Sequence, residues 1–164
     1  MDNLLTERLV LSLIDETDLN ELTTLFTCET IRRYLGGAVS SDKALATLNS
    51  FMQDDAGFYF VVRSKTSNEL VGMIIVARHH NQNDVEISFL FLPNHWGKGY
   101  AREGVKCALT FCKTELKIKR VVSETQSANK NAQRLLEALG YKVENILERF
   151  GAMQTIYVYD YDAG

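Results

Sequence analysis

Hydrophobic and polar positions along this chain follow two different periods, and each period predicts one kind of element. Short apolar runs rich in β-branched and aromatic residues, bounded by polar segments, are typical of β-strands. Apolar residues that recur three and four positions apart are typical of helices with one buried face. The first pattern predicts seven strands, over residues 9–14, 58–63, 70–78, 85–92, 120–125, 141–147 and 155–161.

The helical pattern occurs four times. One helix is expected after Asp15 and a second after Ser40 or Ser41, since these residue types cap helix N-termini. Two longer helices are predicted over residues 100–116 and 129–139. This order of elements predicts a mixed α/β (α+β) fold, in which helices on both faces cover a mostly antiparallel sheet of about seven strands.

The chain shows no internal repeat and no linker rich in Gly, Ser or Pro, so we expect a single domain over residues 1–164. Lys and Arg number 18 against 21 Asp and Glu, a net charge of −3. This balance argues against nucleic acid as a partner and mildly favours a cationic substrate. No apolar run approaches the roughly 20 residues that span a bilayer, and the polar start is unlike a signal peptide. We therefore expect a cytoplasmic protein without a membrane partner.

Cysteine usage points to a reducing compartment. The three cysteines, Cys28, Cys107 and Cys112, are odd in number and lie among apolar neighbours. We interpret them as buried free thiols, because cysteine is often buried and no Cys or His pair has the spacing of a zinc site. No metal is expected.

Candidate chemistry begins where the apolar strand 85–92 ends. Pro93 is the only proline of the chain, and it stops the strand because it has no N–H to donate. Gly97 and Gly99 then allow a tight turn and a close approach of backbone to a ligand. A helix follows at once, and its first N–H groups form an anion site suited to a phosphate or pyrophosphate. Without further context, a plain strand-to-helix turn remains the alternative.

Three segments carry a family resemblance. Residues 86–103, which run from Glu86-Ile87-Ser88 through Trp96-Gly97-Lys98-Gly99-Tyr100-Ala101, resemble the central motif of the GNAT superfamily of N-acetyltransferases. Residues 6–11 and 129–141 resemble the opening strand and the later helix of the branch that acetylates ribosomal-protein N-termini. The matches occur in the family's order and span nearly the whole chain.

The resemblance implies acetyl-CoA as cosubstrate, bound where the sheet splays open after the Glu86 strand. Its pantetheine arm would pair with backbone groups near Leu90, Phe91 and Leu92, and Asn129 matches the asparagine that helps to hold this arm. Its pyrophosphate would lie on the backbone amides of Gly97, Lys98, Gly99, Tyr100, Ala101 and Arg102. One departure is Asn94, where the family's loop often begins with Gln or Arg.

The resemblance also assigns a base but no acid. Glu86 matches the family's glutamate and could accept the proton of the acceptor amine, directly or through water. The alternative is a solvent-facing strand carboxylate that only attracts a cationic substrate. Ala132 and Leu136 occupy the positions where family members carry a serine or a tyrosine, so the general acid is unassigned. Tyr141 is expected to be a core residue. His79 and His80 are interpreted as surface residues of a polar turn, although that turn could reach the acceptor cleft.

Three functions remain open at this point. The first is acetylation of a protein or peptide N-terminal amine. The second is acetylation of a small amine such as a polyamine, an amino acid or an aminoglycoside, and the third is a weakly catalytic acyl-CoA-binding module. Either a monomer or a homodimer is compatible with the sequence.

Overall fold

The computed structural model of this protein describes residues 1–162. Its strands are β1 (Leu4–Leu5), β2 (Leu9–Leu13), β3 (Phe58–Ser64), β4 (Leu70–Arg78), β5 (Val85–Phe91), β6 (Arg120–Gln126), β7 (Lys142–Arg149) and β8 (Ala152–Asp160). Its α-helices are α1 (Leu19–Thr27), α2 (Glu29–Arg32), α3 (Ser41–Gln53), α4 (Tyr100–Thr114) and α5 (Lys130–Leu139). Two short 3-10 helices, η1 (Glu16–Asp18) and η2 (Pro93–His95), precede α1 and α4.

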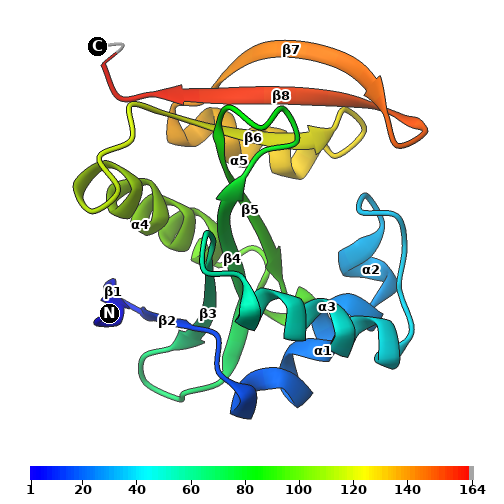
Figure 1. Ribbon diagram of the computed structural model, residues 1–164, viewed down its shortest axis with the longest axis vertical. Helices are drawn as coiled ribbons and strands as arrows, with labels where there is room; N and C mark the ends of the chain where they lie inside the picture. The colour runs from blue at the N-terminus through cyan, green and yellow to red at the C-terminus, as the bar shows by residue number, and fades with distance from the viewer. Residues whose placement is uncertain (163–164) are drawn as a thin grey trace.

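The strands form one sheet in the order β1-β2-β3-β4-β5-β6-β8-β7 (Figure 1). All neighbours are antiparallel except β5 and β6, which are parallel because α4 returns the chain to the same end of the sheet. The predicted mixed, mostly antiparallel sheet is confirmed. The sheet has eight strands where about seven were expected, and the strand that was not predicted is β1, which has only two residues and shows no periodicity.

The four predicted helices are present with small shifts at their ends. Asp15 caps η1, which leads directly into α1, and the Ser40 side chain accepts from the Lys43 N–H to cap α3. The predicted helix 100–116 ends at Thr114, and the last helix begins at Lys130. The short helix α2 was not predicted, because four residues are too few to show a helical period.

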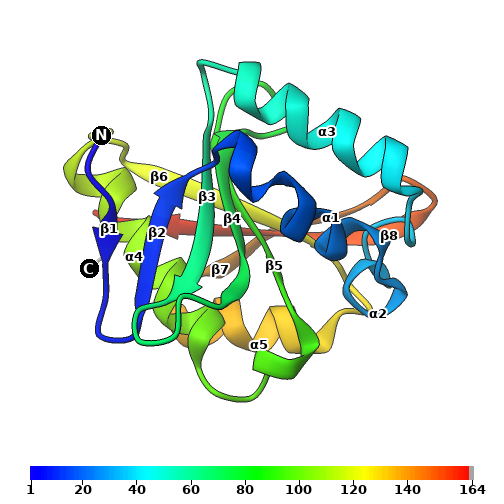
Figure 2. The same ribbon diagram turned by 90° about the horizontal axis from the view of Figure 1, so that it is seen from below.

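Helices cover both faces of the sheet, as Figure 2 shows. Successive side chains of a strand point to opposite faces. Phe60 and Val62 of β3 therefore join the core under α4, and Val61 joins the core under α1 and α3. The first core also takes in Tyr157 of β8, so it reaches into the C-terminal part of the chain.

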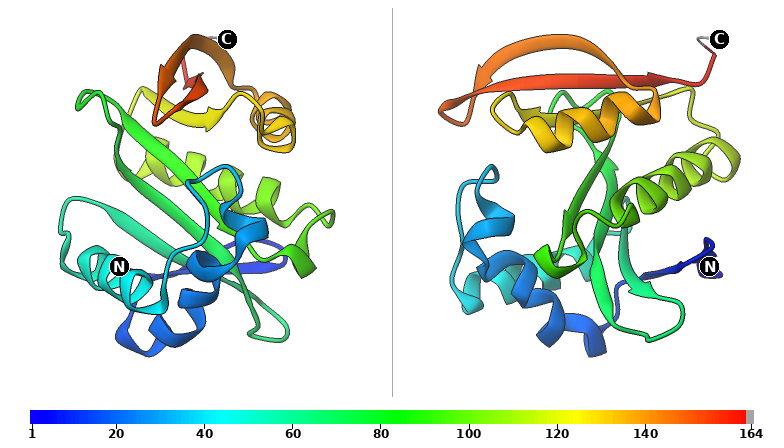
Figure 3. Two further views of the ribbon diagram at one scale, coloured as in Figure 1. Left: turned by 90° about the vertical axis from the view of Figure 1, so that its right-hand side faces the viewer. Right: turned by 180° about the vertical axis from the view of Figure 1, so that it is seen from behind.

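Strands β5 and β6 separate soon after they meet. Their ladder consists of the pairs Val85–Val121 and Glu86–Val122, whereas β4 follows β5 as far as Phe91. Beyond Glu86, the edge of β5 that faces β6 therefore has no strand partner. Figure 3 shows β6, β7, β8 and α5 together at one end of the molecule and α1–α3 at the other. The sheet opens between these two parts, as the resemblance implied.

Candidate active site

The glycine loop joins the end of β5 to the start of α4. The Trp96 indole Nε1–H donates to the Phe91 carbonyl (2.8 Å) and ties the loop to the strand. Gly97 and Gly99 have φ of +76° and +81°, in the left-handed region that favours glycine. Gly99 is the N-cap of α4, and no side chain among residues 1–162 caps this end of the helix. The amides of the first helical turn therefore remain available to an anion.

Arg8 holds this loop in place, a role that sequence reasoning missed. Its Nη1 donates to the Lys98 carbonyl (2.8 Å), and its Nε donates to Glu103 Oε1 (2.7 Å). The guanidinium carbon lies 4.4 Å from the centre of the Tyr100 ring. The start of β2 is thus joined to both the loop and the first turn of α4. Arg8 lies in the segment 6–11 that carried the resemblance, but there it was interpreted only as part of a strand.

The register of β4 and β5 determines which backbone groups face the opening. The Leu92 N–H donates to the Val71 carbonyl (2.9 Å), so Leu92 directs its N–H to β4, and its carbonyl accepts from the His95 N–H (2.9 Å). In an antiparallel ladder these directions alternate along the strand. Leu90 therefore also pairs with β4, whereas Phe89 and Phe91 direct their backbone groups to the opposite edge.

Two of the carbonyls on that edge already have partners. The Ser123 hydroxyl donates to the Ile87 carbonyl (2.6 Å), and Trp96 donates to the Phe91 carbonyl. The N–H and C=O of Phe89 and the N–H of Phe91 remain directed into the opening. Of the three residues expected to offer backbone groups there, Leu90 and Leu92 face β4, because the register sends them to the other edge.

Glu86 lies at the last ladder pair, where the two strands separate. Its Oε2 accepts from the backbone N–H of Glu124 on β6 (2.9 Å). Burial raises the pKa of the Glu86 carboxyl, and the hydrogen bond from the Glu124 N–H is the largest influence that opposes this rise. Within residues 1–162, Glu86 Oε1 has no hydrogen-bond partner and is not sealed from solvent. Glu86 thus has one fixed oxygen and one available to a ligand.

A second group of charged side chains surrounds Glu86. His79 Nε2 lies 2.8 Å from Glu124 Oε1, and Arg149 Nε lies 3.1 Å from Glu124 Oε2, an ion pair by distance that lacks hydrogen-bond geometry. The side chains of His79 and Glu124 are only 1% and 8% exposed. The interpretation of His79 as a surface residue was therefore wrong, because Glu124 of β6 packs against it; His80 is exposed as expected. Sequence spacing gave no signal for this group, since its members are far apart in the chain.

The remaining predicted residues lie on or near α5. The Asn129 side-chain oxygen accepts from the Ala132 N–H (3.2 Å) and so caps this helix. The side-chain NH₂ group of Asn129 takes no part in this bond. Leu136 and Tyr141 are buried, and the Tyr141 hydroxyl lies 3.1 Å from Ser123 Oγ. Burial raises the pKa of Tyr141. The interpretation of Tyr141 as a core residue is confirmed.

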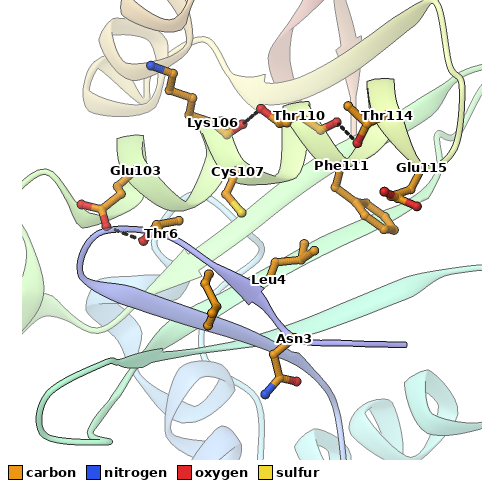
Figure 4. A pocket seen from close by; sticks show the side chains of 11 residues that line it. Asn3, Leu4, Thr6, Glu103, Lys106, Cys107, Thr110, Phe111, Thr114 and Glu115 are labelled. Carbon is orange, nitrogen blue, oxygen red and sulfur yellow. Dashed lines mark hydrogen bonds between the residues drawn. The ribbon is translucent and has the colours of Figure 1, made fainter.

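An open hollow of about 540 Å³ lies between the N-terminal segment and α4 (Figure 4). Leu4, Cys107 and Phe111 are among the side chains around it. None of the predicted cofactor residues lines it. Cys112 is buried, as expected, but Cys28 and Cys107 are only partly buried. Within residues 1–162, no helix is long and apolar enough to span a membrane.

The chain is similar to known proteins in sequence and in fold. The family model described as an acetyltransferase (GNAT) domain matches residues 8–142. An uncharacterized N-acetyltransferase of Bacillus subtilis, YoaA, is 25% identical over 153 residues, which are 88% of this chain and 85% of that protein. A GNAT-family acetyltransferase structure from Bacillus anthracis superposes with a TM-score of 0.85 at 21% identity, covering 97% of this chain and 98% of that one.

A second solved structure includes ligands. It is the spermidine N-acetyltransferase of Vibrio cholerae in complex with CoA and spermine. It superposes with a TM-score of 0.79 at 25% identity and covers 93% of this chain and 94% of that one.

Proposed function

The chain belongs to the GNAT family of acetyltransferases and is an acetyl-CoA-dependent N-acetyltransferase, and we propose that its acceptor carries one primary amine, that of a peptide or protein N-terminus. The charge at the sheet opening carries this proposal. Two carboxylates lie at the opening, Glu86 and Glu124. Glu124 is already paired with Arg149 and in contact with His79, whereas Glu86 forms no ion pair within residues 1–162. One unmatched carboxylate suits one ammonium group and its proton.

The cosubstrate site is proposed at the loop and the open edge of β5. The pyrophosphate would lie on the amides from Gly97 to Arg102, with Lys98 and Arg102 exposed beside them. The pantetheine arm would pair with Phe89 and Phe91, which replaces the expected pairing with Leu90 and Leu92. Asn129 stays the proposed contact from α5.

Catalysis is proposed to use Glu86 as the base. The amine nitrogen attacks the thioester carbonyl, the C–S bond breaks, and the proton of the amine passes to Glu86 Oε1 directly or through a water. A backbone N–H of the open edge would stabilise the carbonyl oxygen as it becomes negative. A thiol has a pKa of about 8.5 in model compounds, so the thiolate can leave without a dedicated side-chain acid. This fits the alanine at position 132 and the buried Leu136.

A polyamine is the second candidate acceptor. It is favoured by the likeness to spermidine N-acetyltransferases, which includes a Vibrio cholerae protein 27% identical over 113 residues. A polyamine carries several ammonium groups, however, and would be held best by several unmatched carboxylates. Residues 6–11 and 129–141, which resemble the ribosomal-protein branch, favour the N-terminal amine.

The core that runs through the chain supports the proposal of one domain over residues 1–164.

The acceptor class is tested by thiol release from acetyl-CoA with a matched panel. The panel holds short peptides with free N-termini, the same peptides with blocked N-termini, spermidine and single amino acids. We expect kcat/KM to be highest for free peptide N-termini and to vanish on blocking. A higher kcat/KM for spermidine than for every peptide would replace the N-terminal amine by the polyamine.

A further inference from the structure

Two side chains from distant segments of the chain meet at the carboxylate of Glu124. His79 comes from the turn between β4 and β5, Glu124 from β6, and Arg149 from the end of β7. The acetyl transfer proposed above uses none of these side chains. A buried polar group costs stability unless it has partners, so a buried set of charged groups beside a reacting carboxylate is expected to have a role there.

Two contacts fix the orientation of the His79 ring. Its Nδ1 accepts from the backbone N–H of Asn81 (3.2 Å). Its Nε2 lies 2.8 Å from Glu124 Oε1, within hydrogen-bond distance. The ring is therefore held between a backbone amide of its own turn and the carboxylate of Glu124.

Each part of Glu124 has a partner in this arrangement. Oε1 accepts from His79, Oε2 is paired with Arg149, and the backbone N–H donates to Glu86 Oε2. A shift of the Glu124 side chain would disturb the peptide that holds Glu86. We propose that His79 and Arg149 are positioning residues that fix Glu124, and that Glu124 in turn sets the position and proton affinity of Glu86.

The proposal deepens the function proposed above and rests on Glu86 as the base. The ionisable groups that face Glu86 are Glu124 from β6, His79 from the β4–β5 turn, Arg149 from β7 and the buried Tyr141 that precedes β7. Glu124 carries a like charge, which disfavours ionisation of Glu86, and Arg149 carries an opposite charge, which favours it. Glu124 and Arg149 therefore act on the pKa of Glu86 in opposite directions.

The test is the pH profile of kcat/KM with one acceptor throughout, so that the titration of the amine is common to all variants. Glu124→Gln removes the like charge and keeps the backbone N–H, so the acid limb should move to lower pH by roughly half a unit or more. Arg149→Gln should move it to higher pH by a similar amount. The proposal would be overturned if the acid limbs of the two variants moved in the same direction, or if both profiles overlaid that of the wild type.

Substitutions of His79 test its hydrogen bond to Glu124. His79→Phe should lower kcat several-fold at unchanged KM for acetyl-CoA, and His79→Gln, which keeps an N–H donor, should recover part of the loss. His80→Gln is the matched control, since His80 is adjacent and exposed. An equal loss in the Phe and Gln variants would remove His79 from the proposal. Glu86→Gln separates a failure of the proposed base from a failure of the proposed positioning. Unchanged turnover in Glu86→Gln refutes the role of Glu86 as base. A loss of turnover in Glu86→Gln, together with Glu124→Gln and Arg149→Gln profiles that overlay the wild type, refutes only the positioning.

Discussion

At the scale of the residue, two opposed influences act on the charge of Glu86. Burial raises its pKa, and the Glu124 N–H stabilises the carboxylate. A half-buried carboxylate with a raised pKa is a stronger base than one in water, and it is also a group that destabilises the fold when it ionises. Its catalytic value and its contribution to stability are therefore expected to differ in sign.

Glu86→Gln tests both consequences. Loss of a positioned base should lower turnover on the order of 10²-fold, while affinity for CoA is unchanged. The folded-state pKa of Glu86 is raised, so its stabilising contribution is complete below the ordinary value of 4.5 and is lost as pH rises through the raised value. The variant should therefore melt at the same or a higher temperature than the wild type near neutral pH, and thermal melts from pH 4 to pH 8 measure this. A Glu86→Gln melting temperature that falls below that of the wild type as pH rises through this range would contradict the sign.

Gly99 is the second residue whose role follows from its own geometry. Valine at its φ of +81° is strained, and a Cβ there would lie 3.3 Å from Arg8 Nη2. Gly99→Val should therefore reorient the loop amides and weaken CoA binding at least tenfold, about 1.4 kcal/mol, as measured by calorimetry.

Gly151→Val is the matched control for this change. Gly151 has a φ of +74°, nothing lies within 4 Å of a Cβ placed there, and it belongs to the β7–β8 turn. The backbone strain of the two variants is similar, about 1–2 kcal/mol, so only the loop variant should lose affinity. Unchanged affinity in a folded Gly99→Val protein would refute the proposed pyrophosphate site.

At the scale of the element, β5 has one paired edge and one open edge. Amides bonded to β4 are protected from exchange by the sheet, whereas those directed into the opening are not. CoA binding should therefore slow hydrogen exchange at Phe89 and Phe91 and leave Leu90 nearly unchanged. Residue-resolved exchange by NMR measures this, and Leu90 is the internal control. Equal protection at Phe89 and Leu90 would place the pantetheine arm elsewhere.

Elements with several periods of apolar residues could be predicted from the sequence, and short ones could not. Helix α4 places Val105, Ala108, Leu109 and Cys112 in the core at helical spacing, so its position was clear. Strand β1 and helix α2 have two and four residues, and both are held by tertiary contacts rather than by a pattern of their own. Their absence from the prediction follows from their length.

The candidate site divides in the same way. The glycine loop and Glu86 are contiguous in a motif and could be found from the sequence. Arg8 lies 95 positions from Glu103, and His79 lies 45 positions from Glu124, so these pairs form only when the sheet is assembled. The polar turn around His79 indicated exposure because turns usually lie at the surface. Its burial depends on β6, which no local pattern reports.

At the scale of the whole molecule, the sheet is divided where the site lies, but the core is continuous. One core cluster runs from Leu9 of β2 through Val105 of α4 to Leu136 and Tyr157 in the C-terminal part. The ladder between β5 and β6 has only two pairs, and α4 also shares one core with residues of the C-terminal part. A continuous core predicts that both parts unfold together, as one cooperative unit.

This cooperativity can be measured with a probe that the chain already contains. Trp96 is the only tryptophan, is 47% exposed, and lies on the loop at the open end of the sheet. Its fluorescence reports on the loop, and far-UV circular dichroism reports on all elements, so a cooperative domain gives coincident transitions. CoA at 100 times its Kd should stabilise the folded state by about 2.7 kcal/mol, which raises both midpoints by roughly 5–10 °C for a domain of this size. In Gly99→Val, whose Kd is expected to rise at least tenfold, the same CoA concentration should stabilise the folded state by at most about 1.4 kcal/mol, so both midpoints should rise by no more than about half as much. A loop transition well below the main one would show that the two parts unfold separately, and would contradict the prediction of a single domain.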